Sequence, residues 1–140
     1  MNSFENAKTF FHNCETAKGW EACKDFVVEG ASFSVQSEAM ASIKTVKEYV
    51  ESMAGLGGIT MPGCSYKLNA SAFDESTNTA LVFATFIGTH SGEGGPVPPT
   101  NKTTHSDYVF AMKMNEEGKV MSVTKIWNSP WAFKELGWSN

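Results

Sequence analysis

The stretch GTHSGEGGPVPPTNKTTHSDYVF, from Gly88 to Phe110, contains two of the chain's three histidines together with four glycines and three prolines. Alternate residues share one face of a strand, so His105 and Asp107 should project from the same face, with Cβ atoms roughly 6–7 Å apart. An aspartate beside an imidazole selects its tautomer and raises its pKa, as acid–base chemistry near neutral pH requires. The two residues are therefore a candidate catalytic dyad, and a structural His–Asp pair at a strand end is the alternative.

His90 ends the apolar segment before this loop, in phase with Val82 and Phe86, so its side chain should leave the sheet on the same face as theirs. We interpret His90 as a candidate hydrogen-bond donor to a substrate oxygen, with a structural role at the loop edge as the alternative. Tyr66, on an earlier strand, is a second candidate donor. His12 lies on the polar side of the first predicted helix, and we expect it to be solvated.

The glycine-rich part of the loop does not have the context of a phosphate-binding site. Phosphate-binding glycines lead into a helix N-terminus, whereas this segment joins two predicted strands and carries three prolines. We interpret it as a rigid surface loop in which Gly92, Gly94 and Gly95 permit positive φ, and which can line the mouth of a pocket.

No spacing in the sequence is typical of a metal or cofactor site. There is neither an H-E-x-x-H motif nor a Cys/His knuckle, and no nucleophile elbow or nucleotide-binding fingerprint occurs. The three cysteines, Cys14, Cys23 and Cys64, lack C-x-x-C spacing and are interpreted as reduced, buried thiols. We therefore expect any chemistry to proceed without metal or organic cofactor.

Composition narrows the class of partner. The 140 residues carry a net charge of −4, and the basic residues are scattered singly, so a nucleic-acid partner is not expected. No apolar run approaches the ~20 residues that a bilayer span needs, so no membrane partner is expected. The N-terminal segment lacks the order of charged and apolar regions found in a signal peptide, so we expect a cytoplasmic protein.

Three segments near the N-terminus have apolar residues at helical spacing. The first covers residues 3–14, with Ser3 placed to cap it, and the second covers residues 20–27. The third is capped by Ser42 or by Thr45, whose side chain can form a capping box with Glu48, and it ends at Gly55 or at Gly57 and Gly58.

Beyond these helices the apolar pattern changes to the alternation typical of strands. In the strand at 65–73, the side chains in phase with Tyr66 and Leu68 are predicted to be buried. Strands are predicted at residues 31–36, 65–73, 79–90, 103–114 and 120–127. One domain over residues 1–140 is expected, an α+β fold with helices packed on the concave face of a strongly bent antiparallel sheet and a pocket between the two layers.

The strand that starts at Thr79 has apolar residues on both faces. Leu81, Phe83 and Ile87 lie on the face opposite to Val82 and Phe86. A single layer of helices covers only one of these faces, so the other should be buried by a second subunit. We therefore expect a C2 homodimer that joins the outer faces of two sheets.

Three segments, FIGTHSGEGGPVPPTNKTTHSDYVF, EEGKVMSVTKIWN and AFKELGW, together with the three-helix start, resemble the nuclear-transport-factor-2-like (NTF2-like) superfamily, specifically its SnoaL-like polyketide cyclase branch. The resemblance spans nearly the whole chain. It implies a cone-shaped fold in which three N-terminal helices cap a curved antiparallel sheet, a homodimer, and an apolar pocket for a small hydrophobic molecule. Members that are enzymes use a few His, Asp and Tyr residues of that pocket as acid–base groups, without metal or organic cofactor.

The chain departs from the family pattern at two positions. Similar proteins commonly have an acidic residue just after the Trp-Asn pair, where this chain has Ser129 and Pro130, and cyclases often have a glutamate where this chain has Ser122. Asp107 would then have to supply the base.

These considerations predict a cofactor-independent lyase or isomerase that moves a proton next to the carbonyl of a small, mostly apolar substrate. Asp107 and His105 would be the acid–base pair, with His90 and Tyr66 as donors to an enolate oxygen. The alternative is a non-catalytic module that binds an apolar ligand or acts as a dimeric scaffold. The expected substrate-binding residues are Trp20, Tyr49, Met53, Trp127 and Asn128.

Overall fold

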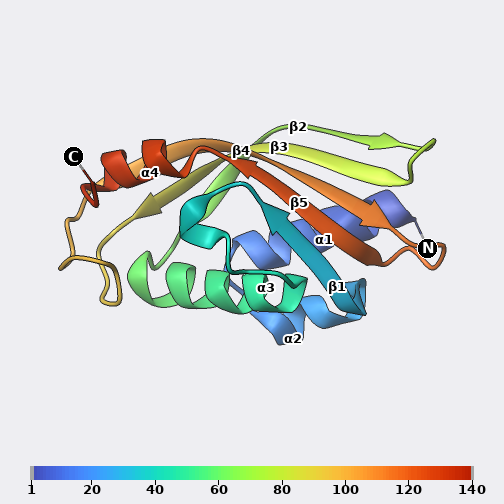
Figure 1. Ribbon diagram of the computed structural model, residues 1–140, viewed down its shortest axis with the longest axis horizontal. Helices are drawn as coiled ribbons and strands as arrows, with labels where there is room; N and C mark the ends of the chain where they lie inside the picture. Colours follow the sequence, from blue (N-terminus) through green and yellow to red (C-terminus); the bar gives the residue numbers. More distant parts are fainter. Residues whose placement is uncertain (1, 140) are drawn as a thin grey trace.

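A computed structural model describes residues 2–139 and shows a curved five-stranded sheet over a layer of helices (Figure 1). The strand order is β1-β5-β4-β3-β2, and every neighbouring pair is antiparallel except β1 and β5, which run parallel. The α+β class and the bent sheet are as predicted, but the parallel pairing of β1 with β5 was not predicted. The strands are β1 (Val27–Val35), β2 (Ser65–Asp74), β3 (Thr79–Thr89), β4 (Thr103–Met114) and β5 (Val120–Trp127).

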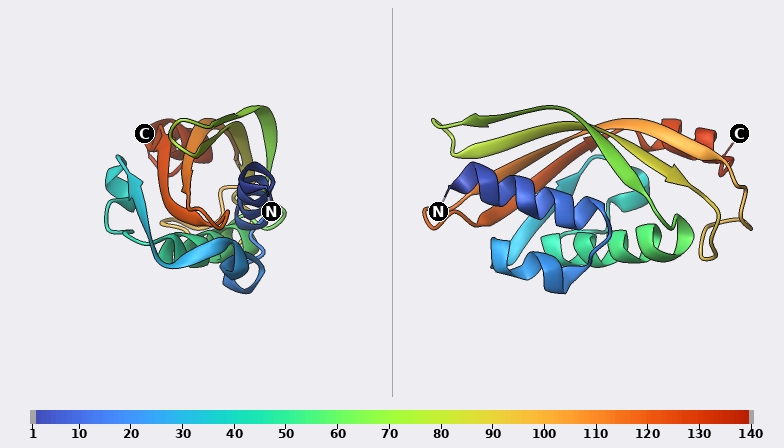
Figure 2. Two further views of the ribbon diagram at one scale, coloured as in Figure 1. Left: turned by 90° about the vertical axis from the view of Figure 1, so that its right-hand side faces the viewer. Right: turned by 180° about the vertical axis from the view of Figure 1, so that it is seen from behind.

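Three helices, α1 (Ser3–Glu15), α2 (Trp20–Cys23) and α3 (Val46–Gly55), cover the concave face, and the sheet curls around them (Figure 2). The core between the two layers is apolar and includes the fully buried side chains of Phe10, Phe110 and Met112. None of the helices in the described range is both long and apolar enough to cross a bilayer.

The start of α3 is determined locally, as predicted. The Thr45 side chain accepts a hydrogen bond from the Glu48 backbone N–H at 3.1 Å, and the Glu48 carboxylate accepts one from the Thr45 N–H at 3.0 Å. This reciprocal capping box satisfies two backbone donors that a helix start otherwise leaves free. At α1 the cap is Asn2 rather than Ser3, because the Asn2 side chain accepts from the Glu5 N–H.

The second predicted helix is shorter than expected, and the strand after it is longer. After α2 the chain makes a 3-10 turn over Lys24–Phe26 and enters β1 at Val27. The valines at this point have the branched side chains that favour strands, and parallel pairing of Val27 with Val120 of β5 places them in the sheet.

The prediction of a continuous buried face on β2 was wrong. The register between β2 and β3 shifts between Leu68, which pairs with Ala84, and Ala70, which pairs with Phe83. An extra residue in one strand reverses the alternation beyond it, so the side chains do not remain on one face. As a result, Ala70 and Ala72 are exposed, and Leu68, which lies before the shift on this edge strand, is itself 50% exposed.

A fourth helix, α4 (Ser129–Leu136), was not predicted and closes one end of the sheet (Figure 1). Its sequence carries the start and stop signals of a helix. The Asn128 side chain accepts from the Trp131 N–H, Pro130 lies in the first turn, and Gly137 ends the helix in the left-handed conformation.

Candidate functional site

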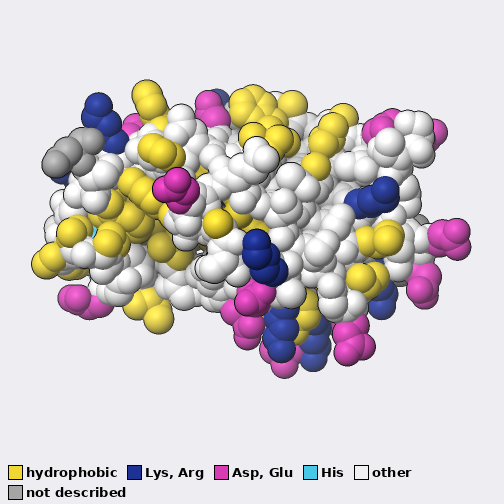
Figure 3. All heavy atoms as spheres, viewed as in Figure 1, with side chains coloured by type: hydrophobic (Ala, Val, Ile, Leu, Met, Phe, Trp, Pro, Cys, Tyr) yellow, Lys and Arg dark blue, Asp and Glu magenta, His cyan; other side chains and the backbone are white. Residues whose placement is uncertain are grey.

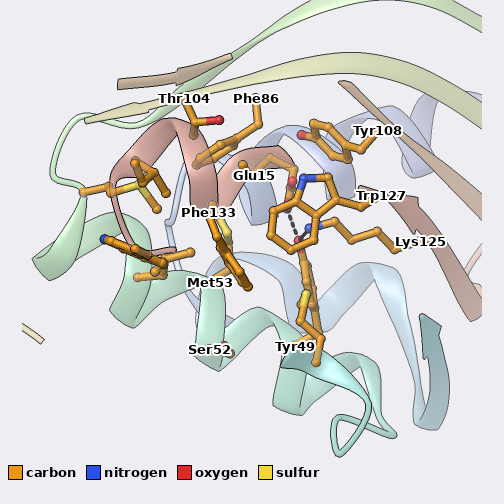
Figure 4. A pocket seen from close by; sticks show the side chains of 16 residues that line it. Glu15, Tyr49, Ser52, Met53, Phe86, Thr104, Tyr108, Lys125, Trp127 and Phe133 are labelled. Carbon is orange, nitrogen blue, oxygen red and sulfur yellow. Dashed lines mark hydrogen bonds between the residues drawn. The ribbon is translucent and has the colours of Figure 1, made fainter. Parts of the chain in front are cut away.

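A narrow cavity of about 60 Å³ lies on the concave side of the sheet, between α3, the ends of β4 and β5, and α4. Its mouth is the region between α3 and α4 where apolar side chains gather in Figure 3. Most of the lining is apolar, with Glu15 and Lys125 among the side chains drawn in its wall (Figure 4). The residues that line it are Glu15, Met40, Tyr49, Ser52, Met53, Leu56, Met61, Phe86, Thr104, Tyr108, Lys125, Trp127, Ala132, Phe133, Leu136 and Trp138.

Two oppositely charged side chains, Glu15 and Lys125, face this apolar cavity. Glu15 is the last residue of α1, at the helix end where backbone carbonyls make a carboxylate unfavourable, and it is 1% exposed. Lys125 is on the inner face of β5 and is 8% exposed. Buried charges are costly unless they are paired or hydrogen-bonded, so a pair of this kind calls for a functional explanation.

A tyrosine joins the two charges (Figure 4). The Tyr49 hydroxyl donates to Glu15 Oε2 at 3.0 Å and accepts from Lys125 Nζ at 3.0 Å. The Cys14 thiol also donates to Glu15 Oε2, at 3.4 Å. Carboxylate, phenol and ammonium therefore form one continuous chain of hydrogen bonds along the cavity wall.

Aromatic rings surround the end of Lys125. Its Nζ lies 4.4 Å from the ring centroid of Trp127, 5.0 Å from that of Tyr49 and 5.2 Å from that of Tyr108. Rings at these distances attract an ammonium ion but do not replace its hydration. Burial lowers the pKa of Lys125, and the nearby Glu15 carboxylate opposes that effect.

Tyr108, on β4, supplies a polar group without a partner. Its hydroxyl is buried close to the Glu15 carboxylate, but no group in the part of the chain that the structure describes meets hydrogen-bond geometry with it. Burial, and next to it the Glu15 carboxylate, raises the pKa of Tyr108, so its proton is retained at neutral pH. Once a neighbouring side chain moves, this hydroxyl can donate to an oxygen atom of a molecule in the cavity.

The predicted dyad lies on the other face of the sheet. His105 and Asp107 do share a face, as the alternation indicated, but that face is the convex one and both side chains are exposed. The Asp107 carboxylate accepts from the Thr85 hydroxyl at 2.7 Å, and the His105 backbone N–H donates to Glu135. Asp107 lines an open groove of the outer face rather than the enclosed cavity.

His90 and Tyr66, the predicted donors, do not line the cavity either. His90 is fully buried behind Trp138, whose indole N–H donates to His90 Nδ1 at 2.9 Å, and His90 Nε2 has no partner within residues 2–139. The Tyr66 hydroxyl lies 2.8 Å from Nδ1 of His12, which is exposed as expected.

Of the predicted substrate-binding residues, Tyr49, Met53 and Trp127 line the cavity. Trp20 instead lies beside β1 in a separate depression, and Asn128 caps α4 and lines the outer groove together with Asp107 and Trp127. The structure therefore brings three of these five side chains together.

Sequence reasoning missed Glu15, Lys125 and Tyr108, although a signal for two of them exists. Glu15 follows Phe11 by four residues, which places it on the apolar stripe of α1, and Lys125 is in phase with the buried Val123. A charged residue on an apolar face is rarely buried without a partner or a function.

The three thiols near this site have raised pKa values, which disfavour the nucleophilic thiolate form at neutral pH. Burial, followed by the Glu15 carboxylate, raises the pKa of Cys23 and of Cys64 to about 11, and burial raises that of Cys14 well above its ordinary value. All three are free, in agreement with their interpretation as reduced buried thiols. Within residues 2–139, no three His, Cys, Asp or Glu side chains are grouped as a metal site would require.

No protein-family model and no curated protein matches the sequence. Solved structures match its fold over nearly the whole chain. A protein of Jannaschia sp. CCS1 assigned as a SnoaL-like polyketide cyclase has a TM-score of 0.79 at 14% identity, over 99% of this chain and 93% of that one. IdmH of Streptomyces antibioticus, also assigned as a polyketide cyclase, has a TM-score of 0.74 at 13% identity, over 98% and 99% of the two chains.

The same fold carries other assigned activities. An LEH-like epoxide hydrolase of M. tuberculosis has a TM-score of 0.67 at 9% identity, over 96% of this chain and 88% of that one. Identities this low establish the fold and not the reaction. The chain thus has the NTF2-like fold, in the form found in SnoaL-like proteins.

Proposed function

We propose that this protein is a cofactor-independent isomerase or cyclase that moves a proton next to the carbonyl group of a small, mostly apolar molecule. One observation carries the proposal: a buried carboxylate, Glu15, and an unpartnered phenol, Tyr108, face the same apolar cavity. A base and a hydrogen-bond donor in a water-poor site are what enolisation requires.

Glu15 acts as the base in this proposal. Its carboxylate takes the proton from the carbon next to the carbonyl, and the electron pair of that C–H bond becomes the C=C bond of the enolate. The Tyr108 O–H donates to the carbonyl oxygen, where negative charge develops. The proton is then returned from Glu15 to the same or a neighbouring carbon, or the enolate carbon attacks a second carbonyl and closes a ring.

Tyr49 and Lys125 hold this base in place. The Tyr49 O–H fixes the orientation of the Glu15 carboxylate, and the Lys125 ammonium offsets its charge through the same hydroxyl. When Glu15 becomes protonated during the reaction, the Lys125 ammonium loses its counter-charge and offsets the negative charge of the enolate instead.

The size of the cavity limits the substrate in the present conformation. A cavity of about 150 Å³ accepts benzene in a well-studied protein, so about 60 Å³ suits a ketone or aldehyde of only a few carbon atoms. A ring system of polyketide or steroid size requires side chains to move. Met40, Met53 and Met61 are flexible enough to allow such movement.

The fold relatives support the reaction class, because cyclases and isomerases are among the functions assigned to them. That support extends no further than the class. The roles of Glu15 and Tyr108 rest on the geometry of this chain alone.

Solvent deuterium exchange into the α-carbon of butanone, followed by NMR, tests the proposal. We expect Glu15→Gln and Tyr108→Phe each to lower the exchange rate at least about 100-fold. Glu51→Gln, which changes an exposed carboxylate on α3, is the matched control and should exchange at the wild-type rate. Full exchange in Glu15→Gln would refute the role of Glu15, and loss of exchange in Asp107→Asn alone would assign the base to the outer face.

We also propose that the protein is a homodimer in a reducing compartment such as the cytoplasm. The outer sheet face carries the exposed apolar side chains Leu81, Phe83 and Ile126, which a second copy would bury. Buried free thiols fit a reducing compartment.

A further inference from the structure

We propose that Lys125 Nζ forms an imine with the carbonyl carbon of an aldehyde or unhindered ketone bound in the cavity. The proposal rests on the substrate class proposed above and adds a covalent step to it. Three features of the geometry carry it: the place of Lys125 in the cavity wall, the unused donors of Nζ, and the route by which its proton can leave.

An ammonium group has three N–H donors, and Lys125 uses one of them. Within residues 2–139 its single acceptor is the Tyr49 hydroxyl, and neither of the salt bridges, Glu5–Lys8 and Glu21–Lys24, involves it. The rings of Trp127, Tyr49 and Tyr108 lie within 5.2 Å of Nζ, and Lys125 also lines the cavity. A buried ammonium with unused donors loses a proton at less cost than a hydrated surface lysine does, and a lysine of this kind serves as a nucleophile toward carbonyl carbon.

The proton that Nζ must lose has a direct route. Nζ donates to the Tyr49 oxygen, and the Tyr49 hydroxyl donates to Glu15 Oε2, each at 3.0 Å. A shift of one proton along each bond converts the ammonium and carboxylate into an amine and a carboxylic acid, and Tyr49 ends with the proton count with which it began. The site remains neutral throughout, as its burial favours.

Imine formation conserves atoms and charge within the site. The nitrogen lone pair of Lys125 attacks the carbonyl carbon, the C=O π electrons move to oxygen, and a proton passes from nitrogen to that oxygen to give a carbinolamine. The protonated Glu15 donates its proton to the hydroxyl group, which leaves as water. The products are an iminium ion, a Glu15 carboxylate and one water molecule, and nothing is oxidised or reduced.

The iminium ion prepares the proton transfer proposed above. Its positive nitrogen accepts the electron pair of the neighbouring C–H bond more readily than a neutral carbonyl does, so the carboxylate of Glu15 removes that proton at lower cost. Hydrolysis of the iminium ion with one water molecule then releases the isomerised carbonyl compound and restores Lys125.

Reductive trapping tests the imine directly. The intact protein is incubated with butanal and cyanoborohydride near pH 7.5, digested, and mapped by mass spectrometry for butylated lysines. The other ten lysines of the chain, of which Lys113 is an exposed example on β4, are internal controls in the same sample. We expect Lys125 to be modified at least about tenfold faster than any of them. Equal rates, or no adduct at Lys125, would overturn the proposal even if no variant folds.

Two variants sharpen the test. Lys125→Met should abolish the adduct at this position. Tyr49→Phe keeps the amine but removes the proton route, so the trapping rate should fall about 100-fold near neutral pH and recover at higher pH, where solvent removes the proton. A Tyr49→Phe protein with an unchanged pH profile would exclude Tyr49 from this positioning role.

Oxygen exchange separates this proposal from the proposed function. Each cycle of imine formation and hydrolysis replaces the carbonyl oxygen of butanone with oxygen from solvent, so ¹⁸O uptake from labelled water reports on Lys125. Deuterium uptake reports on Glu15. Deuterium uptake without ¹⁸O uptake above background would refute the imine but not the proposed proton transfer. Uptake of ¹⁸O without uptake of deuterium would refute the proposed proton transfer but not the imine.

Discussion

Replacing the two buried charges separately and together measures whether Glu15 and Lys125 interact as the structure indicates. The variants are Glu15→Gln, Lys125→Met and the double variant, each close in size to the original side chain. Removing one member of a buried pair leaves the other charge uncompensated, so each single variant should lower the free energy of unfolding by about 3–5 kcal/mol.

The expected coupling follows from the two hydrogen bonds in series. Because Lys125 Nζ and Glu15 Oε2 each lie 3.0 Å from the Tyr49 oxygen, they are at most 6.0 Å apart. At an effective dielectric constant of ~20, two unit charges at that distance attract by about 3 kcal/mol. The double variant should therefore be about 3 kcal/mol more stable than the sum of the single costs indicates.

Urea denaturation followed by tryptophan fluorescence supplies the four free energies. Protein concentration has to be the same for all four proteins, because a dimer unfolds at a midpoint that depends on concentration. The matched control is the cycle of Glu5→Gln and Lys8→Met, an exposed pair on α1 at 3.1 Å, whose coupling should stay below about 1 kcal/mol. Additivity within about 0.5 kcal/mol at Glu15 and Lys125 would refute the reasoning.

Three further predictions concern packing, pH and assembly. Gly57→Ala should destabilise the fold by about 1–3 kcal/mol, because a Cβ atom there would lie 2.5 Å from the Cys64 sulfur. Gly58→Ala is the control, because a Cβ atom at that position has no other atom within 4 Å. Equal thermal midpoints for the two variants would contradict this prediction. Burial raises the pKa of Cys23 and of Cys64 from 9.0 to about 11, so the folded state keeps these thiols neutral at pH values where the unfolded chain ionises them. Their contribution to the free energy of unfolding should be complete below pH 9 and be lost as pH rises from 9 to 11. Urea titrations in which Cys64→Ala keeps the wild-type pH dependence would count against it. Light scattering at low micromolar concentration should give twice the 15.2 kDa of one chain, and Phe83→Glu should give the monomer; a monomeric wild type would rule out the dimer.

Much of the fold could be predicted because its signals are local. Thr45 and Glu48 form their capping box within one turn of helix, and the alternation from Thr79 onward places Val82 and Phe86 in the core without reference to distant residues. The shift at Leu68 could not be predicted in this way, because a bulge depends on the pairing with β3 and leaves no clear trace in the strand itself.

The candidate site could not be predicted from such local signals. Alternation by itself determined that His105 and Asp107 share one face of β4, but only the helices that cover the sheet decided that this face is the convex one. Glu15 and Tyr49 are 34 residues apart, and Tyr49 and Lys125 are 76 apart, so their hydrogen bonds exist only after α1, α3 and β5 have packed together. Periodicity determines which side chains of one element share a face, whereas the meeting of side chains from different elements is set by the packing of those elements.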